Sequence, residues 1–283
     1  MMAKVALVTD STASIPEDLE EKYHIRVAPQ VLIWGSETYL DGIDIQNEDF
    51  YNRLATAKIM PTTSQASPKS FYDIYTCLID EGYHILTIVL SARLSGTLLS
   101  AEQARDQLSG APIEIVDSGT AAMAMGFQVL AAARAAEEGA SLADCKAIAE
   151  QARSHTGVIF TVDTFEFLHR GGRIGGATRL LGTALNVKPI LEITGGQVEP
   201  VDRVRTRTKA LNRVIELVEQ RIAGREPVRM ATLHVNAAED AHKILEKAEE
   251  RFNAIESIFS GVSPVVGTHA GPGTVGLAYM AGM

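Results

Sequence analysis

Short unbroken runs of apolar residues in the first half of the chain alternate with longer segments of helical spacing. Apolar runs of roughly four to eight residues are typical of strands buried on both faces of a parallel sheet. The pattern predicts strands at residues 4–9, 25–28, 84–90 and 113–117, and a hairpin formed by 31–34 and 38–40. It predicts helices at 47–57, 68–81 and 97–107, another that begins with Ser14 as N-cap, and two more before Gly157. Alternating strands and helices predict an α/β fold, a doubly wound domain with a parallel sheet.

The second half of the chain changes character. Strands are predicted at 158–162, 188–194, 198–204 and 230–236 and near Ile258 and Val265, with helices at 208–223 and 239–252. This pattern predicts a smaller α+β domain with a mixed sheet. Because no Pro- or Ser-rich linker separates the halves, we expect two closely packed domains, residues 1–154 and 155–283, with a ligand between them.

Composition narrows the class of protein. The chain has 283 residues, of which 46% are hydrophobic and 22% charged, as in a soluble globular protein. The first residues contain no signal-peptide core, and the least polar stretch, residues 118–133, is shorter than the roughly 18 apolar residues of a membrane span. We therefore expect a buried helix there, no membrane span and a cytoplasmic protein. Cys77 and Cys145 lie in helical patterns without a CxxC neighbour, which predicts two buried free thiols.

Charge is distributed unevenly. Residues 1–154 hold 11 basic and 21 acidic side chains, whereas residues 155–283 hold 15 and 14. Within the second half, residues 170–213 contain nine basic and three acidic residues. This segment favours an anionic partner, either a small phosphorylated ligand or an acidic protein. Nucleic acid is disfavoured, because aromatic residues are not interleaved with the basic ones and the whole chain has a net charge of −9.

Two hydroxyl-rich segments lie beside predicted strands and helices. Residues 62–65 (TTSQ) precede the helix predicted at Pro68, with Ser67 as its N-cap, and residues 91–97 (SARLSGT) follow a buried strand and open the next helix. The free amides and macrodipole at a helix N-terminus attract anions, and ligands of open α/β sheets bind at that edge. Ordinary helix capping by Ser and Thr is the alternative interpretation of each segment.

Two glycine-rich segments occur in the second half. Residues 170–176 (RGGRIGG) combine a flexible backbone with guanidinium groups that bind carboxylates or phosphates, although a surface turn is the alternative. Residues 271–276 match GxGxxG, but only seven residues follow Gly276, too few for a dinucleotide-binding unit. We interpret this segment as a turn that positions His269 after a strand, and a purely structural histidine is the alternative. Neither metal-ligand spacing, a nucleophile elbow nor a P-loop is present in the sequence.

Six segments together carry a resemblance to a known family. They are residues 8–11 (VTDS), 62–65, 91–97, 170–174, 188–190 (KPI) and 267–273 (GTHAGPG). In their order and spacing the chain resembles the DegV family of bacterial fatty-acid-binding proteins. The resemblance implies a two-domain fold shared with the dihydroxyacetone-binding subunit of dihydroxyacetone kinases, with one long-chain fatty acid between the domains. It further implies that the carboxylate is presented to a separate ATP-dependent fatty acid kinase subunit, which makes an acyl phosphate for phospholipid synthesis.

The resemblance also implies roles for individual residues. Thr63 and Ser95 correspond to the hydroxyls that bind the carboxylate, His269 and Arg173 to residues near the pocket mouth, and Arg205 to a residue that contacts the kinase. The chain departs from the family at Ala66, where many relatives have Pro, and at Ala92, where Ser is frequent. No cofactor, metal or catalytic residue of its own is implied.

The residues themselves are compatible with lipid binding, and one rival of another class stays open. Burial of about fifteen CH₂ groups stabilises a complex by about 12 kcal/mol and requires an apolar tunnel with few polar groups. The rival is an enzyme subunit like the dihydroxyacetone-binding protein, in which a His holds a small keto-sugar covalently. A DNA-binding regulator is the least favoured interpretation.

Overall fold

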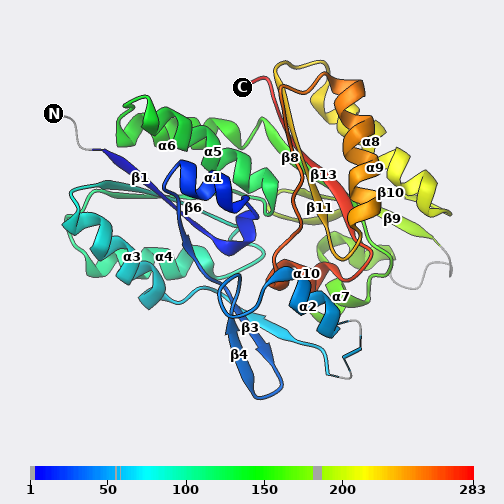
Figure 1. Cartoon of the computed structure of the whole chain (residues 1–283), viewed down its shortest axis with the longest axis horizontal. Coiled ribbons are helices and arrows are strands. Elements are labelled where there is room, and N and C mark those ends of the chain that lie inside the picture. The colour runs from blue at the N-terminus through cyan, green and yellow to red at the C-terminus, as the bar shows by residue number, and fades with distance from the viewer. Residues whose placement is uncertain (1–3, 55, 58, 181–186) are drawn as a thin grey trace.

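Two β-sheets with their helices make up most of the molecule (Figure 1). The computed structural model describes residues 4–54, 56–57, 59–180 and 187–283. Ser67 caps α3 (Pro68–Asp80), and Ser141 forms a capping box with Asp144 at the start of α6 (Leu142–Ala152). Side-chain oxygens at these positions satisfy backbone N–H groups that a helix leaves unpaired. None of the described helices is long and apolar enough to cross a membrane.

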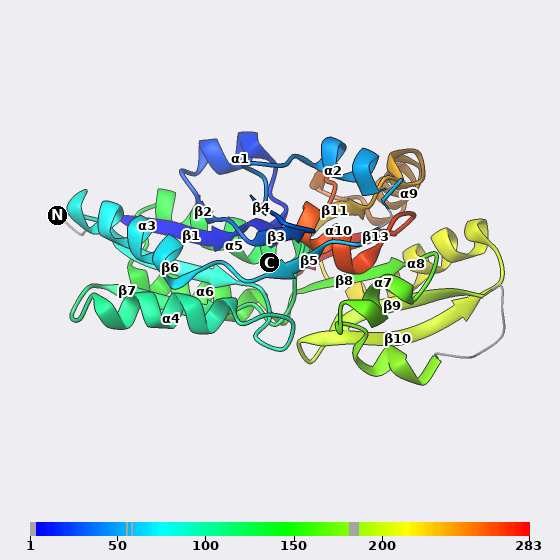
Figure 2. The same cartoon turned by 90° about the horizontal axis from the view of Figure 1, so that it is seen from below.

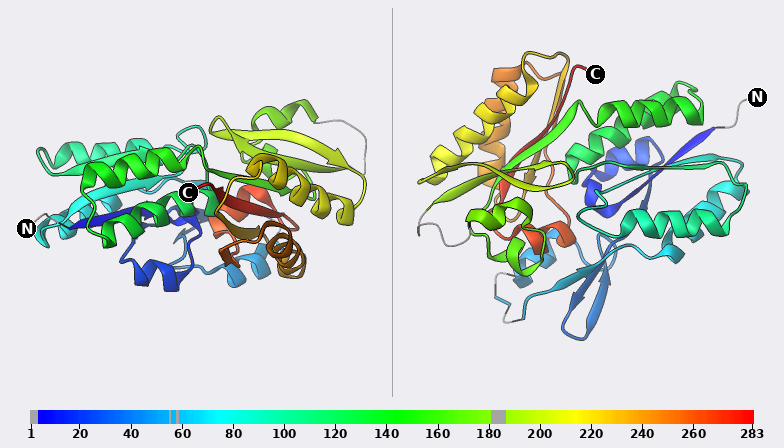
Figure 3. Two further views of the ribbon diagram at one scale, coloured as in Figure 1. Left: turned by 90° about the horizontal axis from the view of Figure 1, so that it is seen from above. Right: turned by 180° about the vertical axis from the view of Figure 1, so that it is seen from behind.

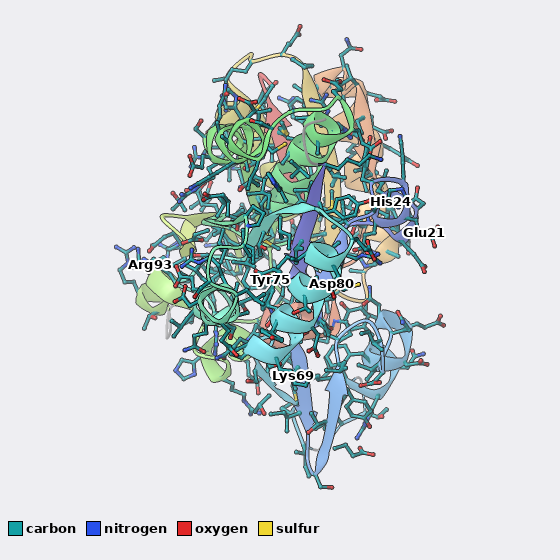
Figure 4. All side chains as sticks on the ribbon, turned by 90° about the vertical axis from the view of Figure 1, so that its left-hand side faces the viewer. Glu21, His24, Lys69, Tyr75, Asp80 and Arg93 are labelled. Atoms are coloured by element: carbon teal, nitrogen blue, oxygen red, sulfur yellow. The ribbon has the colours of Figure 1, made fainter. Side chains whose placement is uncertain are left out.

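The first sheet is parallel and has the order β2-β1-β6-β7, formed by Arg26–Ala28, Val5–Asp10, His84–Val89 and Ile113–Asp117. Helices α3 and α4 (Thr97–Gln107) cover one face, and α5 (Met123–Glu137) and α6 cover the other. Residues Ala6 and Val8 of β1 pack with α3 and α4, while Val5 and Leu7 pack with α5. Tyr75 of α3, labelled in Figure 4, is buried with its hydroxyl 2.8 Å from Thr87 Oγ1 of β6. The predicted doubly wound domain is confirmed.

The second sheet has six strands in the order β10-β9-β8-β13-β11-β12. Their bounds are Gln197–Val204, Lys188–Thr194, Thr156–Thr161, Val275–Ala281, Val228–His234 and Glu256–Ile258. Among the strand pairs that the structure describes in this sheet, β11–β12 is parallel and the other four are antiparallel, so the predicted mixed sheet is confirmed. Helices α8 (Arg207–Ile222) and α9 (Ala238–Phe252) pack on one face (Figure 2).

Helix α5 contacts both sheets. It packs against β1 and β6 of the first sheet and against β8, β11 and β13 of the second. One apolar core therefore runs through both halves of the molecule. Figure 3 shows the two halves side by side from above and from behind. The helix predicted within residues 118–133 is buried as expected, and its apolar surface is explained by burial between two sheets.

A small third sheet lies below the other two in Figure 1 and has the order β4-β3-β5. The predicted hairpin is confirmed as β3 (Val31–Trp34) and β4 (Glu37–Leu40). Strand β5 (Thr62–Ser64) was not predicted, and it pairs with β3 so that Thr63 lies opposite Leu32. Helix α2 (Asn47–Leu54) lies between β4 and β5 in the chain.

Several predictions about local structure are wrong. The residues around Val265 form helix α10 (Pro264–Ala270), because Ser263 caps it and Pro264 suits a first turn. Ser14 is no N-cap: it has a left-handed backbone, φ 55°, after the short η1 helix (Ser11–Ala13), and α1 (Glu17–Lys22) begins after Pro16. Cys145 is buried, but Cys77 is exposed on the outer side of α3.

Candidate functional site

A cavity of about 180 Å³ lies between the first and second sheets and partly opens to solvent. Both halves of the chain contribute apolar walls, which include Leu90, Ala121, Val158, Phe160, Ile193 and Leu233. A ligand that fills this cavity is therefore apolar over most of its surface.

Four of the predicted site residues line this cavity: Thr63, Ser95, Arg173 and His269, here termed the polar cluster. Thr63 Oγ1 lies 2.7 Å from His269 Nε2, although the two residues are 206 positions apart. The pairing of β5 with β3 fixes Thr63, and α10 carries His269. The expectation that His269 follows a strand in a turn is wrong, because it lies in the last turn of a helix.

His269 is neutral at physiological pH. Burial and the neighbouring Arg173 charge lower the pKa of His269 to about 4. Among the described residues, its Nδ1 has no hydrogen-bond partner. Gly171 packs against this edge of the ring, where any Cβ would collide with Nδ1. The imidazole thus orients the Thr63 hydroxyl without adding charge.

Arg173 supplies the positive charge of the polar cluster. It follows a turn in which Gly172 has φ +69°, after the short helix α7 (Glu166–Arg170). Its Nε donates to Leu94 O over 3.0 Å and its Nη1 donates to Gly171 O over 2.7 Å. The first of these bonds joins the second half of the chain to the segment that carries Ser95. Within the described residues, no hydrogen bond from Nη2 is recorded beside these two.

Ser95 lies just before α4, whose N-cap is Gly96. Its Oγ accepts from Thr97 N over 3.3 Å and is 2.9 Å from Thr97 Oγ1. The capping alternative is thus partly right, since Ser95 satisfies one amide of the first turn. Ser95 also lines the cavity, so the two interpretations do not exclude each other.

Arg205 is exposed between β10 and α8, and no described contact joins it to the polar cluster. The positive charge of residues 170–213 is largely balanced by acidic neighbours. Five of its nine basic residues form ion pairs: Arg170, Arg179, Lys188, Arg207 and Arg213. Within the part of the chain that the structure describes, Arg203, Arg205 and Lys209 form none, so the available positive charge is smaller than the sequence indicates.

Sequence reasoning missed a buried polar network beside the cavity. Asp41, 2% exposed, accepts from Ser11 Oγ over 2.6 Å and from Val265 N of α10 over 3.2 Å, and burial raises its pKa to about 6. Asp10 accepts from Leu90 N over 2.9 Å, and burial raises its pKa as well. Asp10 lies in the VTDS segment and so had a signal in the sequence. Asp41 had none, because its partners come from distant segments.

Metal and dinucleotide sites find no support in the described residues. No three His, Cys, Asp or Glu side chains gather there as metal ligands. The GxGxxG match runs into β13, which begins at Val275, rather than into a helix, so no helix N-terminus meets its glycines. The arrangement that is present can bind an anionic group at the polar cluster and an apolar group in the cavity.

Comparison with known proteins places this geometry in context. The sequence profile of a family described as uncharacterised proteins, the DegV family, matches residues 4–282. A DegV domain-containing protein of Streptomyces coelicolor is 37% identical over 279 residues, 98% of each chain. Protein DegV of Bacillus subtilis is 33% identical over 276 residues, 97% of this chain and 98% of that one.

Solved structures give the same result. A DegV family protein from Thermus thermophilus, described by its fatty acid binding, has a TM-score of 0.93 and 34% identity over 98% of this chain and 99% of its own. DegV of Bacillus subtilis, described as a fatty acid binding protein, has a TM-score of 0.89 and 32% identity over 99% of both chains.

Proposed function

This chain belongs to the DegV family, and from that membership we propose that it binds one long-chain fatty acid in the cavity between its two sheets. The observation that carries the proposal is the meeting of the polar cluster with a largely apolar cavity. The related proteins from Thermus thermophilus and Bacillus subtilis, which are described as binding fatty acids, support it.

The polar cluster suits a carboxylate. Ser95 offers a hydroxyl proton, and Thr63 offers one when His269 Nε2 is protonated and donates to Thr63 Oγ1. Arg173 offers a charged N–H donor from the second half of the chain. Hydrogen bonds to a charged acceptor are roughly twice as strong as neutral ones. Neutral His269 keeps Thr63 in place. The proposed site therefore provides one positive charge for one negative charge.

The apolar walls suit an acyl chain. Burial of about fifteen CH₂ groups contributes about 12 kcal/mol at about 0.8 kcal/mol each, before the costs of association. The tail therefore supplies most of the affinity, and the polar cluster supplies orientation. Under the proposed division into domains 1–154 and 155–283, each domain forms a wall of the cavity.

We further propose that the protein presents the carboxylate to a separate, ATP-dependent kinase subunit in the cytoplasm and does no chemistry of its own. Two exposed or half-exposed cations support this step: Arg173 beside the polar cluster, and Arg205 on the surface without a described ion pair. Guanidinium groups suit both the transferring phosphoryl group and an acidic partner surface.

The keto-sugar alternative has less support from the geometry. A covalent bond to His269 requires an exposed ring nitrogen, but Nε2 faces Thr63 and Nδ1 is covered by Gly171. A small polar sugar also leaves the apolar walls of the cavity in contact with water.

Native mass spectrometry of the freshly purified protein separates the two candidates. We expect a non-covalent adduct with the mass of one long-chain fatty acid, lost on denaturation. A small adduct that survives denaturation, without a lipid, would establish the keto-sugar alternative instead.

A further inference from the structure

The end of the β9–β10 hairpin, residues 193–198, forms part of the cavity wall and is here termed the hairpin tip. Ile193 and Val198 lie opposite each other in the two strands, and both line the cavity. The recorded pairs of β9 with β8 involve residues 190–192, so the tip extends past them. Strand β10 is an edge strand (Figure 2), and its register shifts after Pro200. Such irregularities bend a strand, and weakly paired segments open before the core does.

Two hydrogen bonds, here termed the clasp, join the hairpin tip to the first half of the chain. Ser91 Oγ donates to Gly196 O over 2.7 Å, and Arg93 Nη1 donates to Gly195 O over 2.9 Å. Because a carbonyl oxygen only accepts, the direction of both bonds is fixed. Ser91 is 1% exposed, so water does not compete for its bond, whereas Arg93 is exposed. The fit is close, since a Cβ at Gly196 would lie 2.6 Å from Ser91 Oγ.

Ser91 also shapes the segment that carries Ser95. Its carbonyl accepts from Leu94 N over 2.9 Å and from Ser95 N over 3.1 Å, and its Oγ accepts from Arg93 N over 3.2 Å. The clasp is thus built on a turn that is fixed by its own hydrogen bonds. Among the described residues that line the cavity, none belongs to the clasp. The clasp therefore fastens a wall of the cavity without contacting a ligand inside it.

We propose that the hairpin tip is a flap over the cavity and that the clasp controls how fast a fatty acid enters and leaves. This inference rests on the proposed fatty-acid binding. A site that encloses its ligand has to open for exchange. Because the clasp does not contact the ligand, it stabilises the closed form equally with and without lipid. A weaker clasp therefore raises the association and dissociation rates by the same factor and leaves the Kd unchanged.

Stopped-flow fluorescence on delipidated protein measures both rates, with cis-parinaric acid, a fluorescent long-chain fatty acid, as the probe. Ser91→Ala removes one bond of the clasp, and Gly196→Ala places a methyl group against Ser91 Oγ. Gly195→Ala is the matched control: it also has a positive φ, +57°, but the nearest atom to its Cβ is Arg93 Nη1 at 3.8 Å.

We expect both rate constants to rise about fivefold or more in Ser91→Ala and Gly196→Ala, as for the loss of one hydrogen bond, with the Kd within about twofold of the parent value. Gly195→Ala should keep the parent rates. If Ser91→Ala does not fold, the Gly196→Ala and Gly195→Ala pair decides the question by itself.

Two results would overturn the inference. Unchanged rates in Ser91→Ala and Gly196→Ala would mean that lipid enters by another route. Faster dissociation alone, with a matching loss of affinity, would mean that the clasp acts on the bound complex and not on opening. A parent protein that binds no cis-parinaric acid would instead contradict the proposed function.

Discussion

The polar cluster combines one charged side chain, Arg173, with neutral ones. Arg173 carries the positive charge, while burial and that same charge hold the pKa of His269 at about 4 and keep its ring neutral. With Nε2 protonated, the neutral imidazole donates to Thr63 Oγ1 over 2.7 Å and leaves the Thr63 proton for the ligand. We therefore expect Thr63 and Ser95 to contribute to fatty-acid affinity through hydrogen bonds to the charged carboxylate.

Loss of either hydroxyl should weaken fatty-acid binding while most tail burial survives. We expect Thr63→Val and Ser95→Ala each to cost about 1.5–3 kcal/mol, or roughly 10- to 150-fold in Kd, the usual value of a hydrogen bond to a charged group. Calorimetry with palmitic acid measures this, with Thr208→Val on the exposed side of α8 as control. A double variant that retained lipid as fully as the parent would remove these hydroxyls from the site.

The lowered pKa of His269 predicts acid sensitivity. The unfolded ring has a pKa near 6.5 and the folded ring about 4, so the unfolded state binds more protons between these values. The stability that neutral His269 contributes is thus present above pH 6.5 and is lost as the pH falls toward 4. At about 1.4 kcal/mol per pKa unit, the loss amounts to about 3 kcal/mol.

Urea unfolding of the parent and of His269→Gln between pH 4 and 7.5 measures this contribution. The difference in unfolding free energy between the two proteins should shrink as the pH falls. The exposed His169→Gln variant serves as control. A difference that stays constant with pH would show that His269 is not held neutral by the fold.

At the scale of elements, α10 packs against α7, and Gly171, just after α7, lies against the His269 ring of α10. Gly171 has an ordinary helical backbone, φ −75°, yet a Cβ there would collide with His269 Nδ1. Its small size is therefore required by the neighbouring element and not by its own conformation. Gly172 is the opposite case, with φ +69° and open space where a Cβ would lie.

This pair of glycines gives a prediction with its own control. We expect Gly171→Ala to displace His269 and weaken fatty-acid binding at least tenfold. Gly172→Ala should lower stability by about 1–2 kcal/mol through backbone strain and leave the affinity near that of the parent. Calorimetry and thermal unfolding separate the effects, and equal affinities in the two variants would contradict a steric role for Gly171.

The sequence predicted those elements whose signals are local. Strand β6 and helix α4 followed from an apolar run and from helical spacing, and Ser67 and Pro68 marked the start of α3. Strand β5 has only three polar residues and exists through its pairing with β3. Strand β13 was missed because its Gly and Ala residues resemble a turn, although it is wholly buried in the second sheet.

The site was predictable to a similar extent. Thr63, Ser95, Arg173 and His269 came from the resemblance, and the structure brings them to one cavity. Asp41 was not predicted, because its hydrogen-bond partners come from segments far apart in the sequence. Buried polar networks depend on tertiary contacts, which no local pattern records.

At the scale of the whole molecule, the two halves share a core but differ in charge. Arg205 lies on the second half, outside the cavity, so its proposed role concerns the partner and not the lipid. Charges on exposed surfaces mainly affect the rate of encounter and its dependence on salt. Holding the lipid and presenting it should therefore be separable by substitution.

We expect Arg205→Glu to slow acyl-phosphate formation by the cognate kinase several-fold, to make the remaining rate less sensitive to salt, and to leave lipid content unchanged. Arg173→Ala should lose turnover even at saturating kinase, because its guanidinium lies beside the polar cluster. Kinase assays with lipid-loaded variants, alongside bound lipid by mass spectrometry, test both. Loss of lipid in proportion to activity in Arg205→Glu would assign that charge to the lipid site.

The central claim is that a fatty-acid carboxylate binds at the polar cluster with its chain in the cavity between the sheets. A crystal structure of the protein with palmitic acid tests it most directly. The account predicts one carboxylate within hydrogen-bonding distance of Thr63 Oγ1 and Ser95 Oγ, and an acyl chain running along Val158, Phe160 and Leu233. A carboxylate bound elsewhere, or a cavity that stays free of lipid at saturating palmitic acid, would contradict it.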